Sequence, residues 1–360
     1  MTRSSPTGDG PEDDEPEGLE PWSETPAPAG ELPGGALTGP PGGRIFSLED
    51  RPVPALYLGA WLFSAGGLVA LLVATQAELS PSRSLIALAG ILALGLGLAA
   101  GAAYQLVSRS DRHPDLYRGP SPPLLFGLVL VVSSLASALL GLAGLADPDL
   151  PVGFLIGLVV VALVYLVCIE LFVVKGGALS WLEMGWPPRR PGMLRLALRD
   201  VGVAIAVMVP VTFGVLIWGA LLASILQVSA PETLPEAHGS VEALAVVLAA
   251  AVIAPIGEEA FFRGFALTAW LRDLGERPAL IRSALFFAFV HILNIRVGVE
   301  QASEGLSQAI LEFAVILPLG LALGWLFLRR GMVAAIAGHM AYNGFLLVLV
   351  ALARSTTSGG

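Results

Sequence analysis

The feature that most constrains this chain is a series of apolar stretches that recurs from Ala55 towards the C-terminal end. Most reach the roughly 20 residues that a helix needs to cross the 30 Å hydrocarbon core of a bilayer. Lipid offers no hydrogen-bond partner to an open backbone, so each stretch is expected to be an α-helix. The stretches cover residues 55–76, 84–107, 123–145, 152–174, 200–227, 241–257, 279–295, 307–328 and 331–352.

The pattern predicts an all-α fold, a polytopic transmembrane helical bundle with about nine spans, or eight, and a cytoplasmic N-terminus. The sixth stretch is short, but an amphipathic continuation to about Trp270 extends it to a full span. With nine spans, 14 of the 18 basic residues after residue 50 fall on the cytoplasmic side and 3 on the other. This distribution follows the positive-inside rule and favours nine spans over eight.

The formal net charge of −9 belongs to one end of the chain. Residues 1–50 hold 11 of the 29 acidic and 2 of the 20 basic residues, together with 9 Pro and 9 Gly. Such a composition predicts a disordered acidic tail. We therefore expect N-terminal transmembrane helices over 51–235, a core with most of the intramembrane polar residues over 236–352, and a short polar tail over 353–360.

Two adjacent carboxylates directly follow the sixth apolar stretch, in the sequence Gly257-Glu258-Glu259-Ala260-Phe261-Phe262-Arg263-Gly264. On a helix Glu259 and Arg263 are four residues apart and share a face, so they are expected to form an ion pair. Glu258 points about 100° away and lacks that partner. An unpaired carboxylate beside a paired one in a medium of low dielectric constant is expected to be a stronger base, as a general base requires.

Two histidines lie inside later stretches, each with a companion one turn away on the same face: Phe287 with His291, and His339 with Asn343. With nine spans, His291 lies about 18 Å and His339 about 12 Å from the cytoplasmic ends of their helices. Glu258 falls in the same half of the bilayer. The sequence therefore predicts that Glu258, His291 and His339 meet around one point, and the site hypothesis fails if they do not.

Several other intramembrane chemistries are excluded by the sequence. Cys168 is the single cysteine, which rules out a cysteine-cluster metal site, and no His-Glu-x-x-His string occurs. No aspartate lies deep in a span. Gly305-Leu306-Ser307, the nearest candidate for a serine nucleophile, falls on the outer side. The remaining carboxylates lie near expected span ends and are expected to pair or reach the interface: Glu170, Asp200 and Glu312.

The three polar groups, in this order, resemble the CAAX-protease and bacteriocin-processing family of intramembrane proteases, known as CPBP or Abi. Its pattern is Glu-Glu-x-x-x-Arg, then Phe-x-x-x-His, then His-x-x-x-Asn. The matching residues here are Glu258, Glu259, Arg263, Phe287, His291, His339 and Asn343. The resemblance covers about residues 240–350, so it implies a CPBP-like catalytic core over 236–352.

The resemblance implies an intramembrane endopeptidase, a CAAX prenyl protease-like hydrolase. Glu258 and His291 would hold and activate the attacking water, and His339 and Asn343 would stabilise the oxyanion. Glu259 and Arg263 would orient the site, with Phe287 in support. Glu258, His291 and His339 would be the ligands of a Zn²⁺ ion if the enzyme is a metalloprotease, but they could also act on water without metal.

The expected partners are a peptide or membrane-protein substrate and the lipid bilayer, with no nucleic acid and the oligomeric state left open. The expected location is the cell membrane, multi-pass, with the active site towards the cytoplasmic half. Two alternatives stay open: a transporter or proton-coupled channel, and a non-catalytic membrane scaffold or immunity protein. A transporter would show an inverted repeat with interrupted helices in both halves, and the sequence shows no such repeat.

Overall fold

A computed structural model describes residues 48, 51–76, 80–147, 149–188, 191–228, 234–294 and 302–357. The side chains of residues 294, 302–304 and 353–357 lie outside this description. The chain divides into two units, Met1–Asp50 and Arg51–Gly360. The expected acidic tail is the first unit, and apart from Leu48 it lies outside the described residues. The helices described below belong to the second unit.

The regular structure of the described residues is entirely helical, as predicted. The first half contains α1 (Pro54–Gln76), α2 (Pro81–Ser108), α3 (Pro122–Leu142), α4 (Pro151–Ile169), the π-helix η1 (Glu170–Val174) and α5 (Met193–Leu226). The second half contains α6 (Ser240–Leu248), η2 (Ala249–Ile253), α7 (Ala254–Glu259), η3 (Ala260–Leu267), α8 (Thr268–Leu274), α9 (Glu276–His291), η4 (Ile292–Asn294), α10 (Ala302–Arg330) and α11 (Met332–Thr357). Each of the first four α-helices begins with a proline, whose missing N–H and fixed φ suit a first turn.

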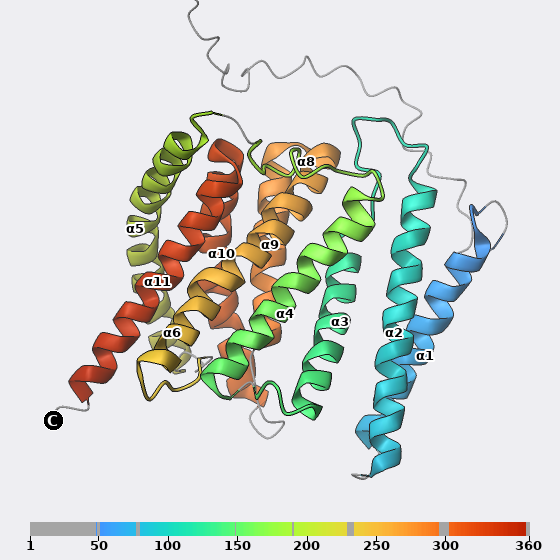
Figure 1. The fold of residues 1–360 in the computed structure, drawn as a ribbon, viewed down its shortest axis with the longest axis horizontal. Helices are drawn as coiled ribbons and strands as arrows, with labels where there is room; N and C mark the ends of the chain where they lie inside the picture. The colour runs from blue at the N-terminus through green and yellow to red at the C-terminus, as the bar shows by residue number, and fades with distance from the viewer. Residues whose placement is uncertain are drawn as a thin grey trace, which may run out of the picture. The chain divides into compact units, whose positions relative to one another are not determined.

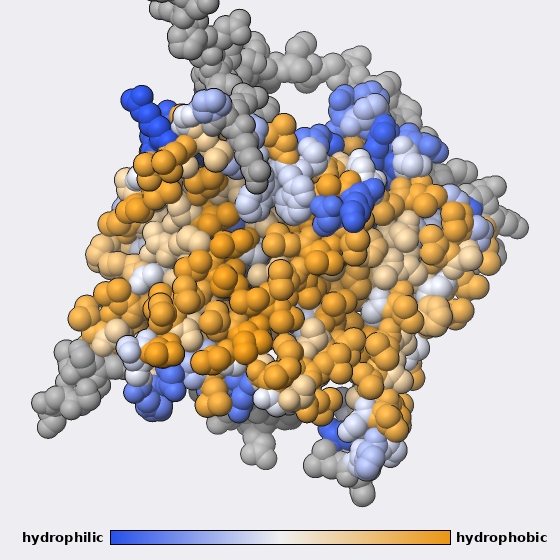
Figure 2. All heavy atoms as spheres, viewed as in Figure 1, coloured by the Kyte–Doolittle hydropathy of each residue, from blue (hydrophilic) through white to orange (hydrophobic). Residues whose placement is uncertain are grey.

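Eight helices of the described chain are long and apolar enough to cross a membrane, which makes this a multi-pass membrane protein. Figure 2 shows apolar residues over the middle of the helices and hydrophilic residues at their two ends. The sixth of these helices runs unbroken over Ser240–Leu274. It therefore contains the amphipathic continuation expected beyond residue 257. The side on which the N-terminus lies stays a prediction.

The preference for nine spans is not matched by the count of long apolar helices. The stretch expected at 279–295 is α9, which has 16 residues and is followed by the short η4. Polar side chains at Glu276, Arg277 and Arg282 occupy its first turns, so too little apolar length remains for it to be counted as a span. The expected range of eight to nine spans includes the observed eight.

The helices lie side by side, with α1 and α2 at one edge and α5 at the other (Figure 1). Close approach of α1 and α2 depends on glycine, because a Cβ on Gly67 would lie 2.5 Å from the Leu94 amide nitrogen. The same is true of Gly97, which packs against the backbone of Ser64. Small residues at such contacts allow helices to pack without a hydrophobic driving force between them.

The core of the second half is aromatic and lies around η3. Phe261, Phe262, Phe265 and Phe287 are at most 1% exposed. Their rings meet edge-on or tilted, with centroids of Phe262 and Phe287 5.1 Å apart. These rings fill the space between the sixth membrane-spanning helix and α9. Their close packing holds Glu258 and His291, which lie on these two helices, at fixed positions.

Candidate active site

Three side chains from three different helices meet in the second half of the chain. Glu258 comes from α7, His291 from the end of α9 and His339 from α11. Glu258 Oε2 lies 3.9 Å from Nε2 of His291 and 3.9 Å from Nε2 of His339. The distances are too long for direct hydrogen bonds but suit a small molecule that bridges the groups. The structure therefore brings together the three residues that the sequence expects to meet.

The hydrogen bonds of the two imidazole rings determine which nitrogens face Glu258. His291 Nδ1 lies 2.7 Å from the Phe287 carbonyl oxygen, and His339 Nδ1 lies 2.8 Å from Glu259 Oε1. A carbonyl and a carboxylate oxygen accept, so Nδ1 of each ring carries the proton and donates. In the neutral rings both Nε2 atoms then present a lone pair towards Glu258. This arrangement can bind and polarise a water molecule.

The carboxylate that His339 contacts belongs to a buried ion pair. Arg263 donates to Glu259 Oε1 at 2.8 Å, and both side chains are fully buried. The predicted pair of residues four apart is thus confirmed. Arg263 also donates to the Gly320 carbonyl oxygen at 3.3 Å. Its guanidinium lies 4.0 Å from the centre of the Phe287 ring. Glu259 therefore links two cation-forming groups and fixes the orientation of His339.

Phe287 supports both histidines, as the sequence expects of a residue one turn before His291. Its ring centroid lies 4.4 Å from that of His291 and 5.9 Å from that of His339. Both contacts are edge-to-face, and Phe287 itself is fully buried. The ring limits the rotamers that either imidazole can adopt.

Asn343 lies beside the site but its amide is engaged elsewhere. Its Nδ2 donates to the Ala250 carbonyl oxygen at 2.8 Å. Ala250 belongs to η2, where the widened turn of a π-helix changes the usual backbone pairing. Asn343, for which the family resemblance implies a role at the oxyanion, here ties α11 to the helix that carries Glu258.

Two π-helices flank the acidic pair, and the sequence analysis did not anticipate either. η2 ends five residues before Glu258, and η3 begins directly after Glu259. Such segments in an α-helix often occur at functional sites, because they shift the faces that successive side chains present. One signal was available in Pro255, which has no N–H to donate to the carbonyl four residues earlier.

A Zn²⁺ ion at Glu258, His291 and His339 was expected only if the chain uses a metal. The donor chemistry suits zinc, since each imidazole donates its far N–H to a second group. In the described part of the chain, however, no group of three or more His, Cys, Asp and Glu side chains is arranged to hold a metal ion. Metal dependence therefore stays a prediction.

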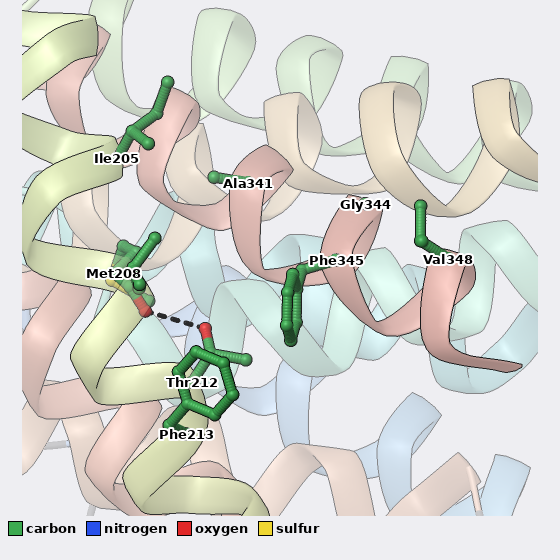
Figure 3. A pocket seen from close by; sticks show the side chains of 9 residues that line it. Ile205, Met208, Thr212, Phe213, Ala341, Gly344, Phe345 and Val348 are labelled. Carbon is green, nitrogen blue, oxygen red and sulfur yellow. Dashed lines mark hydrogen bonds between the residues drawn. The ribbon is translucent and has the colours of Figure 1, made fainter. Parts of the chain in front are cut away.

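The site is separate from an apolar cavity of about 290 Å³ between α5 and α11. Figure 3 shows its lining, with Phe213 and Phe345 near each other and the Thr212 hydroxyl donating to the Met208 carbonyl at 2.7 Å. The α11 residues of this lining lie two, five, six and nine residues beyond His339, on the opposite face of α11. The cavity therefore does not open onto Glu258.

Ion pairs hold the polar end of α8 against the preceding loops. Arg272 pairs with Glu183, and Arg112 lies 3.5 Å from Asp273. Burial acts to raise the pKa of Glu183, but hydrogen bonds from Ser180 and the charge of Arg272 outweigh it and leave the pKa below its usual value. The sixth membrane-spanning helix is thus anchored at the end nearer to Arg263.

Comparison with known proteins covers the same part of the chain as the site. Residues 240–345 match the family described as type II CAAX prenyl endopeptidase Rce1-like. No curated protein and no solved structure matches the chain. The match includes every residue of the three motifs, from Glu258 to Asn343. Residues 240–345 are therefore similar to the Rce1-like type II CAAX prenyl endopeptidases, which confirms the resemblance to CPBP proteases over this part of the chain.

Proposed function

We propose that this protein is an intramembrane endopeptidase that hydrolyses a peptide bond with a water molecule held by Glu258 and His291. The observation that carries the proposal is the convergence of Glu258 Oε2 with both histidine Nε2 atoms at 3.9 Å. The family match supports protease activity. The substrate is a peptide or a membrane-protein segment, and the site works in the cytoplasmic half of the cell membrane.

The proposed steps of hydrolysis follow from the positions and hydrogen-bond partners of Glu258, His291 and His339. Glu258 accepts a proton from the water, and the water oxygen attacks the carbonyl carbon of the substrate. His339, with Nδ1 donating to Glu259, stabilises the resulting oxyanion when its Nε2 is also protonated. The proton moves from Glu258 through His291 Nε2 to the amide nitrogen, and the carbon–nitrogen bond breaks. A carboxylic acid and an amine leave the site.

Asn343 takes a different part in this scheme from the one expected of it. Its hydrogen bond to Ala250 supports a role in holding η2 and so the position of Glu258. Direct contact with an oxyanion would require the amide to leave that carbonyl oxygen.

The test is cleavage of an internally quenched peptide with a prenylated cysteine near its carboxyl end, in phosphatidylcholine liposomes. Glu258→Gln keeps the shape of the side chain but removes the base, so the rate should fall by about 10²–10⁴-fold. Glu170→Gln is the matched control, because this carboxylate accepts from Trp181 Nε1 at 3.0 Å, away from the site residues. Full cleavage by a folded Glu258→Gln variant would overturn the proposal.

Zinc binding by Glu258, His291 and His339 stays a separate prediction that the same assay addresses. If the enzyme is a metalloprotease, a chelator stops cleavage and added Zn²⁺ restores it. If Glu258 and His291 act on water without a metal, cleavage continues in the presence of the chelator. Elemental analysis of the purified protein gives an independent reading.

A further inference from the structure

A groove of about 270 Å³ lies between α3, α8 and α9, outside the candidate active site. Its lining consists of one arginine and five apolar residues: Pro123, Trp270, Arg282, Leu285, Phe286 and Phe289. The four α9 residues of this lining are three or four residues apart, the spacing of a single helix face. His291 lies nine residues after Arg282, a rotation of about 180°, so this face of α9 is not the one that carries His291.

Aromatic rings form the floor of the groove. Trp270 is buried, and its ring centroid lies 5.7 Å from that of Phe286. Phe126 of α3 meets Phe286 at 5.5 Å, which joins α3 to α9. Leu285 and Phe289 border the groove and are exposed. Large exposed apolar side chains on a membrane protein are expected to face lipid, so the groove is accessible to hydrocarbon chains.

Arg282 is the one charged residue of the lining, and no acidic group of the described chain compensates it. Its guanidinium lies 5.1 Å from the centre of the Trp270 ring, a cation–π contact. Among the described residues it makes no hydrogen bond and no ion pair. The two acidic residues that precede it most closely are paired with other arginines: Asp273 with Arg112, and Glu276 with Arg329.

The charge and the apolar surface of the groove follow one another along α9. Arg282 lies six residues, or about 9 Å, from Glu276 at the polar start of the helix. Phe289 lies seven residues further, about 10 Å deeper. The long arginine side chain can extend towards the membrane interface while its stem covers apolar surface. A basic residue beside an apolar groove between helices is suited to an anionic lipid headgroup with its chain beside it.

We propose that this groove is a binding site for an anionic phospholipid, whose phosphate contacts Arg282 and one of whose acyl chains lies along Leu285, Phe286 and Phe289. A guanidinium binds phosphate through charge-assisted hydrogen bonds. A zwitterionic lipid brings its own cation beside the phosphate, which reduces the attraction to Arg282, so the site prefers lipids with a net negative charge. The inference does not depend on the proposed function.

The first experiment measures headgroup preference by native mass spectrometry of the full-length protein with phosphatidylglycerol and phosphatidylcholine at equal concentrations. Wild type should retain phosphatidylglycerol in preference, and Arg282→Gln should bind it about fivefold more weakly, as expected for one basic residue at an anionic surface. Arg277→Gln is the matched control, because Arg277 is exposed on the same helix but lies outside the lining. Unchanged binding by Arg282→Gln, or equal weakening in both variants, would overturn the proposal.

The second experiment tests whether the groove holds an acyl chain. Leu285→Trp enlarges an exposed side chain at the border of the groove and should lower the retention of phosphatidylglycerol. Ile281→Trp is the matched control, since Ile281 is exposed on α9 outside the lining. Glycerol phosphate, which has the charge but no chain, should not displace the lipid at equal concentration. Displacement by glycerol phosphate, or full retention by Leu285→Trp, would contradict a chain in the groove.

A second copy of the chain is the competing occupant of the groove. The single cysteine, Cys168, is buried, so Phe289→Cys in a Cys168→Ser protein places one exposed thiol at the groove. With phosphatidylglycerol in the groove, this variant should stay monomeric in oxidised liposomes. A disulfide-linked dimer would assign the groove to a second copy and overturn the lipid site.

Discussion

The first two helices and the segment 240–345 are both apolar, but they use their side chains differently. α1 has no acidic, basic or histidine side chain, and 6% of its most apolar window is buried inside the protein. In the corresponding windows of Ser240–Leu274 and Gly305–Arg330 the buried shares are 33% and 39%. α1 and α2 hold together through glycine contacts, whereas the later helices surround a buried ion pair and two histidines.

The difference shows which feature of a membrane sequence is informative about function. Apolar length predicts that a segment crosses the bilayer, and it does so equally well for both regions. Ionisable residues in such a segment persist only where other groups compensate for their burial. Glu259 and Arg263 are fully buried and paired, and His339 contacts the same carboxylate. In this chain the departures from apolar composition coincide with the candidate site.

The largest effect on stability is expected at the buried ion pair. Arg263→Met leaves Glu259 buried without its cation and should destabilise the protein by about 3–5 kcal/mol. The measurement is thermal unfolding in detergent. The double variant Glu259→Gln with Arg263→Met should recover much of this loss, because no uncompensated charge stays buried. An Arg263→Met protein as stable as wild type would show that the stability of the segment 240–345 does not depend on its buried ion pair. The segment would then not differ from α1 and α2 in this respect.

A packing change should damage the N-terminal helices without touching the chemistry. Gly67→Leu forces α1 away from the backbone of α2, at an expected cost of about 1–3 kcal/mol. Gly66→Leu is the matched control, since a Cβ there meets nothing within 4 Å. Both variants should cleave the reporter peptide at the wild-type rate once folded. A large fall in kcat for folded Gly67→Leu would show that the packing of α1 against α2 affects the active site.

The role of Asn343 can be decided by a smaller effect. If Asn343 holds η2 through Ala250, Asn343→Ala should lower kcat about tenfold, or about 1.4 kcal/mol, and speed up amide exchange in Ala249–Ile253. Gly344→Ala should change neither, because its added Cβ meets nothing within 4 Å. A loss of about 10²–10³-fold without faster exchange would instead indicate a direct oxyanion contact.

The smallest effect on stability is expected at the polar end of α8, outside the apolar helices compared above. The pKa of Glu183 is lowered in the folded protein, chiefly by Ser180 and Arg272 against the effect of burial. Its contribution to stability is therefore present above the unfolded pKa and is lost as the pH falls through the folded pKa. Glu183→Gln should cost about 0.5 kcal/mol at pH 7 and almost nothing at strongly acidic pH. A stability difference between wild type and Glu183→Gln that grows as the pH falls would contradict a lowered pKa of Glu183.

Much of the fold could be predicted, because two physical requirements act on every residue of a span. Apolar length and the need for internal backbone hydrogen bonds place α1, α2 and the continuous helix of α4 and η1 within about three residues of their observed ends. The starts of α5 and α10 lie seven and five residues before the predicted ones, and α9 is too short to be counted as a span because Arg277 and Arg282 shorten its apolar part. The depth argument could bring Glu258, His291 and His339 together because helices have a fixed rise per residue.

The finer features of the site depend on contacts that helical periodicity does not encode. The amide of Asn343 can reach Ala250 only because α11 packs against a widened turn, and no spacing in the sequence reports that turn. The same holds for the close packing of Gly320 and Gly324 of α10 against Ala284 and Leu280 of α9. Helical spacing therefore predicts which polar side chains meet more readily than it predicts their hydrogen-bond partners.

The most direct test of the central claim is hydrolysis in liposomes prepared in heavy-oxygen water. Mass spectrometry of the cleaved reporter peptide then shows where the water oxygen goes. The account predicts one heavy oxygen in the new carboxyl end for wild type and Glu170→Gln, and no cleaved product for Glu258→Gln. Product without heavy oxygen, or labelled product at the wild-type rate from Glu258→Gln, would contradict a water-based site at Glu258, His291 and His339.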